Sequence, residues 1–112
     1  MIYDSAFFGT EVKFIVEIVS QGFDMARDDF EIVLKRGTYT RTYAKSDLVV
    51  EVVTETVDGH EVEKINYYLC FDTREFGKGI MTAIITAHVP DVDFPDGIRD
   101  EVEKFDFFNV KW

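Results

Sequence analysis

The sequence is poor in the residues that usually cross-link small proteins or carry out chemistry. Cys70 is the only cysteine, so no internal disulfide can form and stability has to come from packing. Its run, YYLCF, is apolar and has no basic neighbour, which predicts a buried, unreactive thiol. The two histidines, His60 and His88, lie far apart in the sequence and no cysteine cluster accompanies them, so there is no zinc pattern.

Basic residues and long apolar runs are also scarce. Twelve Lys and Arg stand against 22 Asp and Glu, which gives a net charge of −10. Phosphate backbones and anionic membranes would be repelled, so we expect neither nucleic acid nor a membrane as a partner. No run approaches the roughly 20 apolar residues that span a bilayer, and MIYDSAFFGT lacks the regions of a signal peptide. We therefore expect a cytoplasmic site of synthesis, unless the chain is a fragment or a larger assembly carries it elsewhere.

What the chain does contain is apolar alternation with a period of two and many aromatic residues, including eleven Phe. This period predicts strands over 12–19, 28–35, 38–43, 48–57, 61–71, 80–89 and 98–110. Asp58-Gly59 predicts a type I′ hairpin turn. Asp72 is expected to cap one helical turn that Gly77 closes. The last region breaks strict alternation, which predicts a bend or a β-bulge.

Seven or eight short strands with turns between them predict one all-β domain over residues 1–112. The expected fold is an immunoglobulin-like antiparallel β-sandwich, with a small barrel as the alternative. The Cys…Trp…Cys core of antibody domains is missing, so the topology is less closely specified than the class.

Acidic residues concentrate in one loop that follows the strand at 80–89. Asp91, Asp93 and Asp96 are the only candidates for a metal site, since hard oxygen ligands alternate there before a glycine. Counted from Asp91, the fifth, sixth and twelfth positions do not hold the acid, Gly and Glu of an EF-hand loop. A carboxylate pair for hydrolysis would need a cleft and a raised pKa, which so small a sandwich rarely supplies. We therefore expect an exposed turn.

No nucleophile is placed in a catalytic motif. Ser5, Ser20 and Ser46 lie in turns or near the terminus, without a nucleophile-elbow sequence. Gly77 and Gly79 are too few for a phosphate loop. The chain is therefore expected to be non-enzymatic, with no cofactor, no catalytic residue and no small-molecule ligand.

Aromatic residues and the acidic loop supply the candidate contact surface. Alternation places Tyr39 and Tyr43 on one face with Arg41 between them, and exposed aromatics can stack on sugars or anchor a protein. Core packing is the simpler interpretation for at least half of the tyrosines. Phe108 and Trp112 either cover one end of the sandwich or make a contact. The predicted contact surface comprises Tyr39, Arg41, Tyr43, Asp91, Asp93, Phe94 and Asp96.

Two segments carry a family resemblance. Residues 9–37, GTEVKFIVEIVSQGFDMARDDFEIVLKRG, resemble the opening of immunoglobulin-like phage domains such as the N-terminal domain of baseplate upper proteins. Residues 72–101, DTREFGKGIMTAIITAHVPDVDFPDGIRDE, resemble the end of such domains, where a turn, a strand and an acidic loop follow one another. The core positions implied for the first segment are Phe14, Val16, Ile18, Phe30, Ile32 and Leu34.

The whole chain is also similar to small proteins of phages and prophages of gut Bacteroides-type bacteria. The likeness is one of pattern and transfers no catalytic residue. It implies a structural or tail-associated virion protein whose partners are other virion or assembly proteins, or further copies of itself. Baseplate proteins continue into a long extension after the sandwich, whereas this sequence stops at Trp112. The alternative function is a carbohydrate- or surface-binding module that uses the Tyr39–Tyr43 face and the acidic loop.

Overall fold

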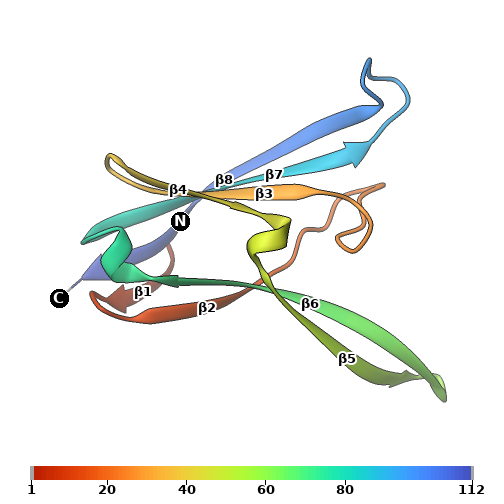
Figure 1. The fold of residues 1–112 in the computed structure, drawn as a ribbon, viewed down its shortest axis with the longest axis horizontal. Coiled ribbons are helices and arrows are strands. Elements are labelled where there is room, and N and C mark those ends of the chain that lie inside the picture. The colour runs from red at the N-terminus through yellow and green to blue at the C-terminus, as the bar shows by residue number, and fades with distance from the viewer. Residues whose placement is uncertain (1, 112) are drawn as a thin grey trace.

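The computed structural model describes residues 2–111 and consists of two β-sheets packed face to face (Figure 1). The strands are β1 (Ile2–Phe7), β2 (Glu11–Val16), β3 (Phe30–Arg36), β4 (Tyr39–Ala44), β5 (Val49–Val57), β6 (His60–Asp72), β7 (Gly79–Pro90) and β8 (Ile98–Lys111). Two single 3₁₀ turns, η1 (Lys45–Asp47) and η2 (Thr73–Glu75), join strands. No helix among the described residues is long and apolar enough to cross a membrane. The predicted all-β sandwich is confirmed.

The strand order is that of an immunoglobulin-like sandwich. One sheet has the order β1-β8-β7-β3-β4, and the other has the order β2-β6-β5. Strands β8-β7-β3-β4 therefore take the positions G, F, C and C′ of a variable-type domain, facing B, E and D. One strand pair departs from the antiparallel arrangement, because β1 pairs with β8 in parallel. The chain turns at Gly9 and crosses to the other sheet as β2, so β1 borders the last strand and not β2.

Aromatic rings from both sheets meet in the core. Phe14 on β2 meets Phe107 on β8 edge to face, with ring centroids 4.8 Å apart. Phe71 on β6 contacts the ring of Phe107 at 5.8 Å and that of Phe76, after η2, at 5.8 Å. These rings join the two sheets, and each buries a large apolar area. The six core positions that the resemblance implied are all buried or packed against this core.

The predicted irregularity of the last strand is a β-bulge. Ile80 pairs with Asn109 and Thr82 with Asp106, so Phe107 and Phe108 together oppose Met81. This extra residue on β8 explains why strict alternation fails there.

The turn predictions are also confirmed. Asp58 and Gly59 both have positive φ, 51° and 78°, as a type I′ turn requires. The Asp72 carboxylate accepts a hydrogen bond from the Arg74 amide at 2.9 Å and so caps η2, and Gly77 follows with φ 81°. The strand expected over 12–19 ends earlier, at Val16, where its pairing with β6 stops at Tyr67.

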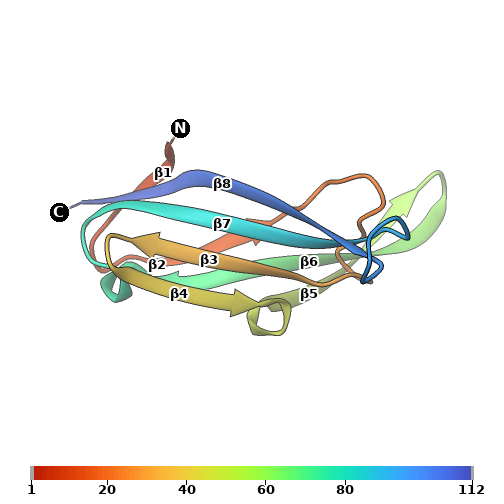
Figure 2. The same cartoon turned by 90° about the horizontal axis from the view of Figure 1, so that it is seen from above.

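The hairpin formed by β5 and β6 extends away from the sandwich (Figures 1 and 2). We call residues 49–65 the β5–β6 arm. The radius of gyration is 16.1 Å, whereas a compact domain of this length has about 13 Å. In Figure 1 the arm diverges from the opposite hairpin, β7–β8, so the two sheets are packed closely at one end and are apart at the other.

Candidate functional site

The acidic loop is held by its own hydrogen bonds. Asp91 accepts one from the Asp93 amide at 3.0 Å and one from the Arg99 side chain at 3.0 Å. These two contacts, the backbone amide first, lower the pKa of Asp91. Asp93 and Asp96 are exposed, as is Phe94. Within residues 2–111 no three His, Cys, Asp or Glu side chains are arranged to hold a metal ion. The first aspartate of the loop therefore has a structural use.

The other half of the predicted contact surface lies elsewhere. Tyr39 pairs with Arg36 at one end of β3, whereas Phe30, at the other end, pairs with Ala87 near the acidic loop. The two halves are therefore at opposite ends of the sheet (Figure 2). The sequence grouped them on one surface, and the structure does not bring them together.

The β4 side chains have contacts of their own. Tyr43 pairs with Ile32 and Arg41 pairs with Leu34. Both β4 residues therefore lie on the core side of the sheet, as their buried partners do. Tyr43 is half-buried against the core, and burial is the main cause of its raised pKa. The Arg36 guanidinium lies 4.9 Å from the Tyr39 ring centre, and Arg41 is 3.7 Å from Glu75. The Tyr39 ring and the Arg41 guanidinium, which a sugar would contact, thus already have partners within the protein. These contacts give the carbohydrate-binding alternative no support.

Cys70 and the two histidines are on the surface. The prediction of a buried thiol was wrong: Cys70 is exposed, because β6 alternates and its neighbours Leu69 and Phe71 take the core side. His88 contacts Asp100 across β7 and β8, with Nδ1 and Oδ1 2.6 Å apart. Such a cross-strand pair stabilises a sheet. His60 is exposed at the tip of the β5–β6 arm.

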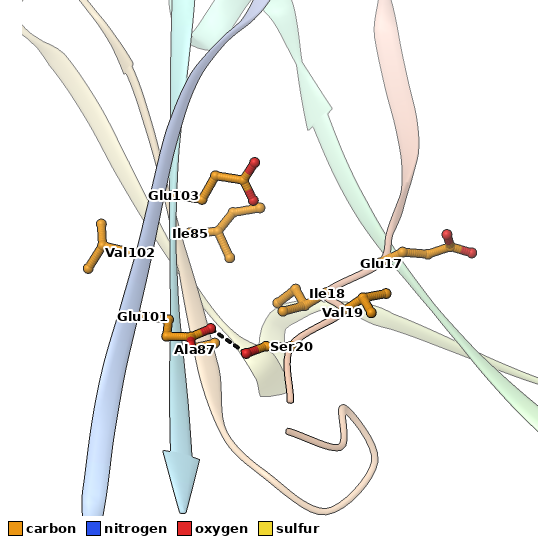
Figure 3. Close-up of a pocket in the computed structure, with 9 residues that line it drawn as sticks. All are labelled: Glu17, Ile18, Val19, Ser20, Ile85, Ala87, Glu101, Val102 and Glu103. Carbon is orange, nitrogen blue, oxygen red and sulfur yellow. Dashed lines mark hydrogen bonds between the residues drawn. The ribbon is translucent and has the colours of Figure 1, made fainter. Parts of the chain in front are cut away.

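A groove of about 350 Å³ opens beside β8, between that strand and residues 17–20 (Figure 3). Ile18 and Ile85 face each other across it, and the Glu101 carboxylate accepts a hydrogen bond from the Ser20 hydroxyl at its lower end. That bond and the ion pair with Arg99 lower the pKa of Glu101. A general acid needs the opposite shift, so Glu101 is not suited to that role.

The β5–β6 arm is the part of the surface that departs most from an ordinary sandwich. Every residue of the arm is exposed except Val53, which is intermediate, so neither of its faces is covered. Val52 is 59% exposed and its cross-strand partner Ile65 40%. The exposed large apolar side chains of the arm are Val49, Val50, Val52, Val57, Val62 and Ile65. Val50, Val52 and Ile65 share one face, and a grouped apolar surface of this kind marks a contact site more often than scattered single residues do.

Both outer edges of the arm are unpaired, because β2 pairs with β6 only over 67–72 and no described strand lies beyond β5. β5 hydrogen-bonds only to β6, and none of the other backbone hydrogen bonds found in residues 2–111 involves residues 49–57. The row of N–H and C=O groups on its outer side is thus open to another strand. Seven of the nine residues are Val or Thr, the types that favour β-structure, and none is Pro, Lys or Arg.

The other open edges are shorter or protected, including that of β6 over 60–66, where three of the seven residues are charged. β1, β2 and β4 have six residues each. Lys13 on β2 and Arg41 on β4 place a positive charge on those edges, a common protection against pairing. Residues 98–105 of β8 extend beyond β1, but five of these eight are charged. The nine residues of β5 therefore form the edge best suited to receive a further strand.

The charge on the arm is predominantly negative. Its acids outnumber its single base, Lys64, by five to one: Glu51, Glu55, Asp58, Glu61 and Glu63. Glu51 accepts hydrogen bonds from the Tyr68 hydroxyl at 3.1 Å and the Asn66 amide at 3.2 Å. Both donors are neutral and leave its charge uncompensated. The Tyr68 pKa is raised, by burial first and by Glu51 second.

Comparison with known proteins adds no assignment, since no family model, curated protein or solved structure matches this chain.

Sequence reasoning missed the arm, although one signal for it was present. The segments 48–57 and 61–71 are longer than the predicted strands of the first 43 residues, and the DG turn joins them directly. A hairpin longer than its sandwich has to extend past it. Alternation alone could not show this, because the valines of β5 suggest a buried strand equally well. Trp112, the other predicted terminal contact, lies outside the described residues, whereas Phe108 is buried.

Proposed function

We propose that this protein is a non-enzymatic assembly module that joins other proteins through strand addition at the open edge of β5. The observation that carries the proposal is the nine-residue unpaired edge on an arm exposed on both faces. Strand addition gives affinity through backbone hydrogen bonds, and side chains at alternate positions give specificity.

The resemblance to phage and prophage domains suggests where such a module acts. We propose a virion or tail-associated role, in which the partners are other virion or assembly proteins. Exposed Val and Ile side chains on the arm would be buried in such an assembly, which offsets the cost of exposing them to water in the free protein.

The experiment is a measurement of mass in solution by light scattering. The wild-type chain is measured alone and with each protein encoded by the neighbouring genes, and then the Val52→Lys variant is measured in the same way. A lysine on the edge opposes strand pairing. We expect a defined complex with the wild type and its loss in the variant.

The matched control is Val102→Lys on β8, a position that is 65% exposed and lies outside the arm. It adds the same side chain at a valine of another strand. A complex that survives Val52→Lys as well as Val102→Lys would contradict docking at β5. A strict monomer that binds none of the tested proteins would contradict the assembly role itself.

A further inference from the structure

We infer that the segment received by β5 carries two basic residues four positions apart on one face, with β-branched residues between and beside them. This inference deepens the proposed function and rests on it, since it names the chemistry of the partner strand.

The spacing follows from the face on which the acids lie. Side chains alternate along a strand, so Glu51, Val53 and Glu55 share one face of β5. The register agrees, since their partners on β6 are Asn66, Lys64 and Val62. An added strand would place a residue directly opposite each of them, and those opposite the two glutamates must be basic or neutral.

The other face of β5 determines which residues the added strand carries at its remaining positions. Val50, Val52, Thr54 and Thr56 alternate with the acids and point to the side that continues from the buried Tyr67. Val50 is 55% exposed there. β-branched residues on the added strand would cover these positions, since such pairs pack well across a ladder.

A second copy of the chain fits this edge poorly. In the symmetric antiparallel pairing that uses all nine residues, Val53 opposes itself and Glu51 opposes the Glu55 of the other copy twice. Like charges placed directly opposite each other destabilise a sheet. Shifting the register avoids this contact but shortens the pairing, and it still brings together two arms that each carry five acids and one base. Charge complementarity therefore favours a basic partner strand over self-pairing.

The test uses three end-capped, fluorescently labelled peptides of seven residues, titrated with the wild-type protein. The first has lysine at positions two and six, valine at position four and threonine or valine elsewhere, a pattern that fits β5 in either direction. The second has glutamate in place of both lysines. The third has lysines at positions two and five, which places them on opposite faces.

We expect the first peptide to bind about tenfold more tightly than either of the others, and less tightly at high salt, where ion pairs are screened. The Glu51→Lys/Glu55→Lys variant should reverse the preference between the lysine and glutamate peptides. Its thermal unfolding, compared with that of the wild type, shows that the exposed arm is still folded.

Equal binding of the first and second peptides would overturn the charge requirement, and equal binding of the first and third would overturn the spacing. Binding of none of them would also overturn the inference. None of these results would contradict docking at β5, because that is decided by the mass measurement with Val52→Lys.

Discussion

Phe107 and Phe108 are adjacent in the sequence, yet both side chains are buried and their rings meet edge to face with centroids 4.4 Å apart. Adjacent residues of a regular strand point to opposite faces. The bulge opposite Met81 removes this constraint, so β8 contributes two consecutive rings to the core. The same bulge sets the register in which the rest of β8 meets β7.

The first prediction concerns this pair. Phe107→Ala should lower the free energy of unfolding by about 3–5 kcal/mol, because the cavity would lie where rings from both sheets meet. Val102→Ala, at an exposed position of the same strand, should change it by less than about 0.5 kcal/mol. Urea unfolding measures both variants. Similar small changes in the two would mean that Phe107 is not a core residue.

Gly37 and Gly77 both have positive φ, so comparing their alanine variants distinguishes the cost of backbone strain from that of a side-chain collision. At Gly37 an added Cβ meets open space, whereas at Gly77 it would lie 2.9 Å from the Arg36 guanidinium, which donates to the Phe76 carbonyl. Gly37→Ala should cost about 1 kcal/mol and Gly77→Ala more. Thermal unfolding in the Arg36→Ala background should bring the two costs closer together. Equal costs in the wild-type background would show that Arg36 simply moves aside.

Asp28 predicts an acid-dependent loss of stability. The neighbouring Arg27 side chain is the main cause that lowers the Asp28 pKa from 3.8 to about 2. The folded pKa lies below that of the unfolded chain, so the contribution is present above about pH 4 and is lost as the pH falls toward 2. Asp28→Asn should therefore be less stable than wild type at pH 7, and the difference should shrink at low pH. Parallel pH profiles for the two proteins would contradict this.

Cys70 provides a direct check of strand orientation. Because it is exposed on β6, Ellman's reagent should react fully with the native protein, without urea. The opposite orientation of β6 would place Cys70 in the core in place of Leu69 and Phe71, and the thiol would then react only after unfolding. A slow, urea-dependent reaction would contradict the observed register.

Much of the fold could be predicted because its signals are local. Alternation located every strand except β1, and the paired positive φ values of Asp58 and Gly59 follow from the residue types. Two features were not predictable in this way. The exposure of the Cys70 thiol depends on which face of β6 meets the other sheet. An apolar run such as YYLCF does not show which of its alternate residues point to the core. The unpaired edge of β5 depends on the order of strands in the sheet, which is a non-local property.

The candidate site shows the same limit. Tyr39 was chosen from the alternation of its strand and Asp91 from the acids of its loop, and pairing with opposite ends of β3 separates the two. The exposure of Val52 and Ile65 arises from the length of the β5–β6 arm relative to the sandwich, which no single residue encodes.

The measurement that tests the central claim most directly is amide hydrogen exchange along β5, before and after the lysine peptide or a natural partner is added. Docking at the open edge predicts that slowed exchange is concentrated in residues 49–57, where N–H groups gain carbonyl partners, and that β2 and β4 are unchanged. Protection at β2, at β4 or in the loop 91–97, with no change at 49–57, would contradict the account.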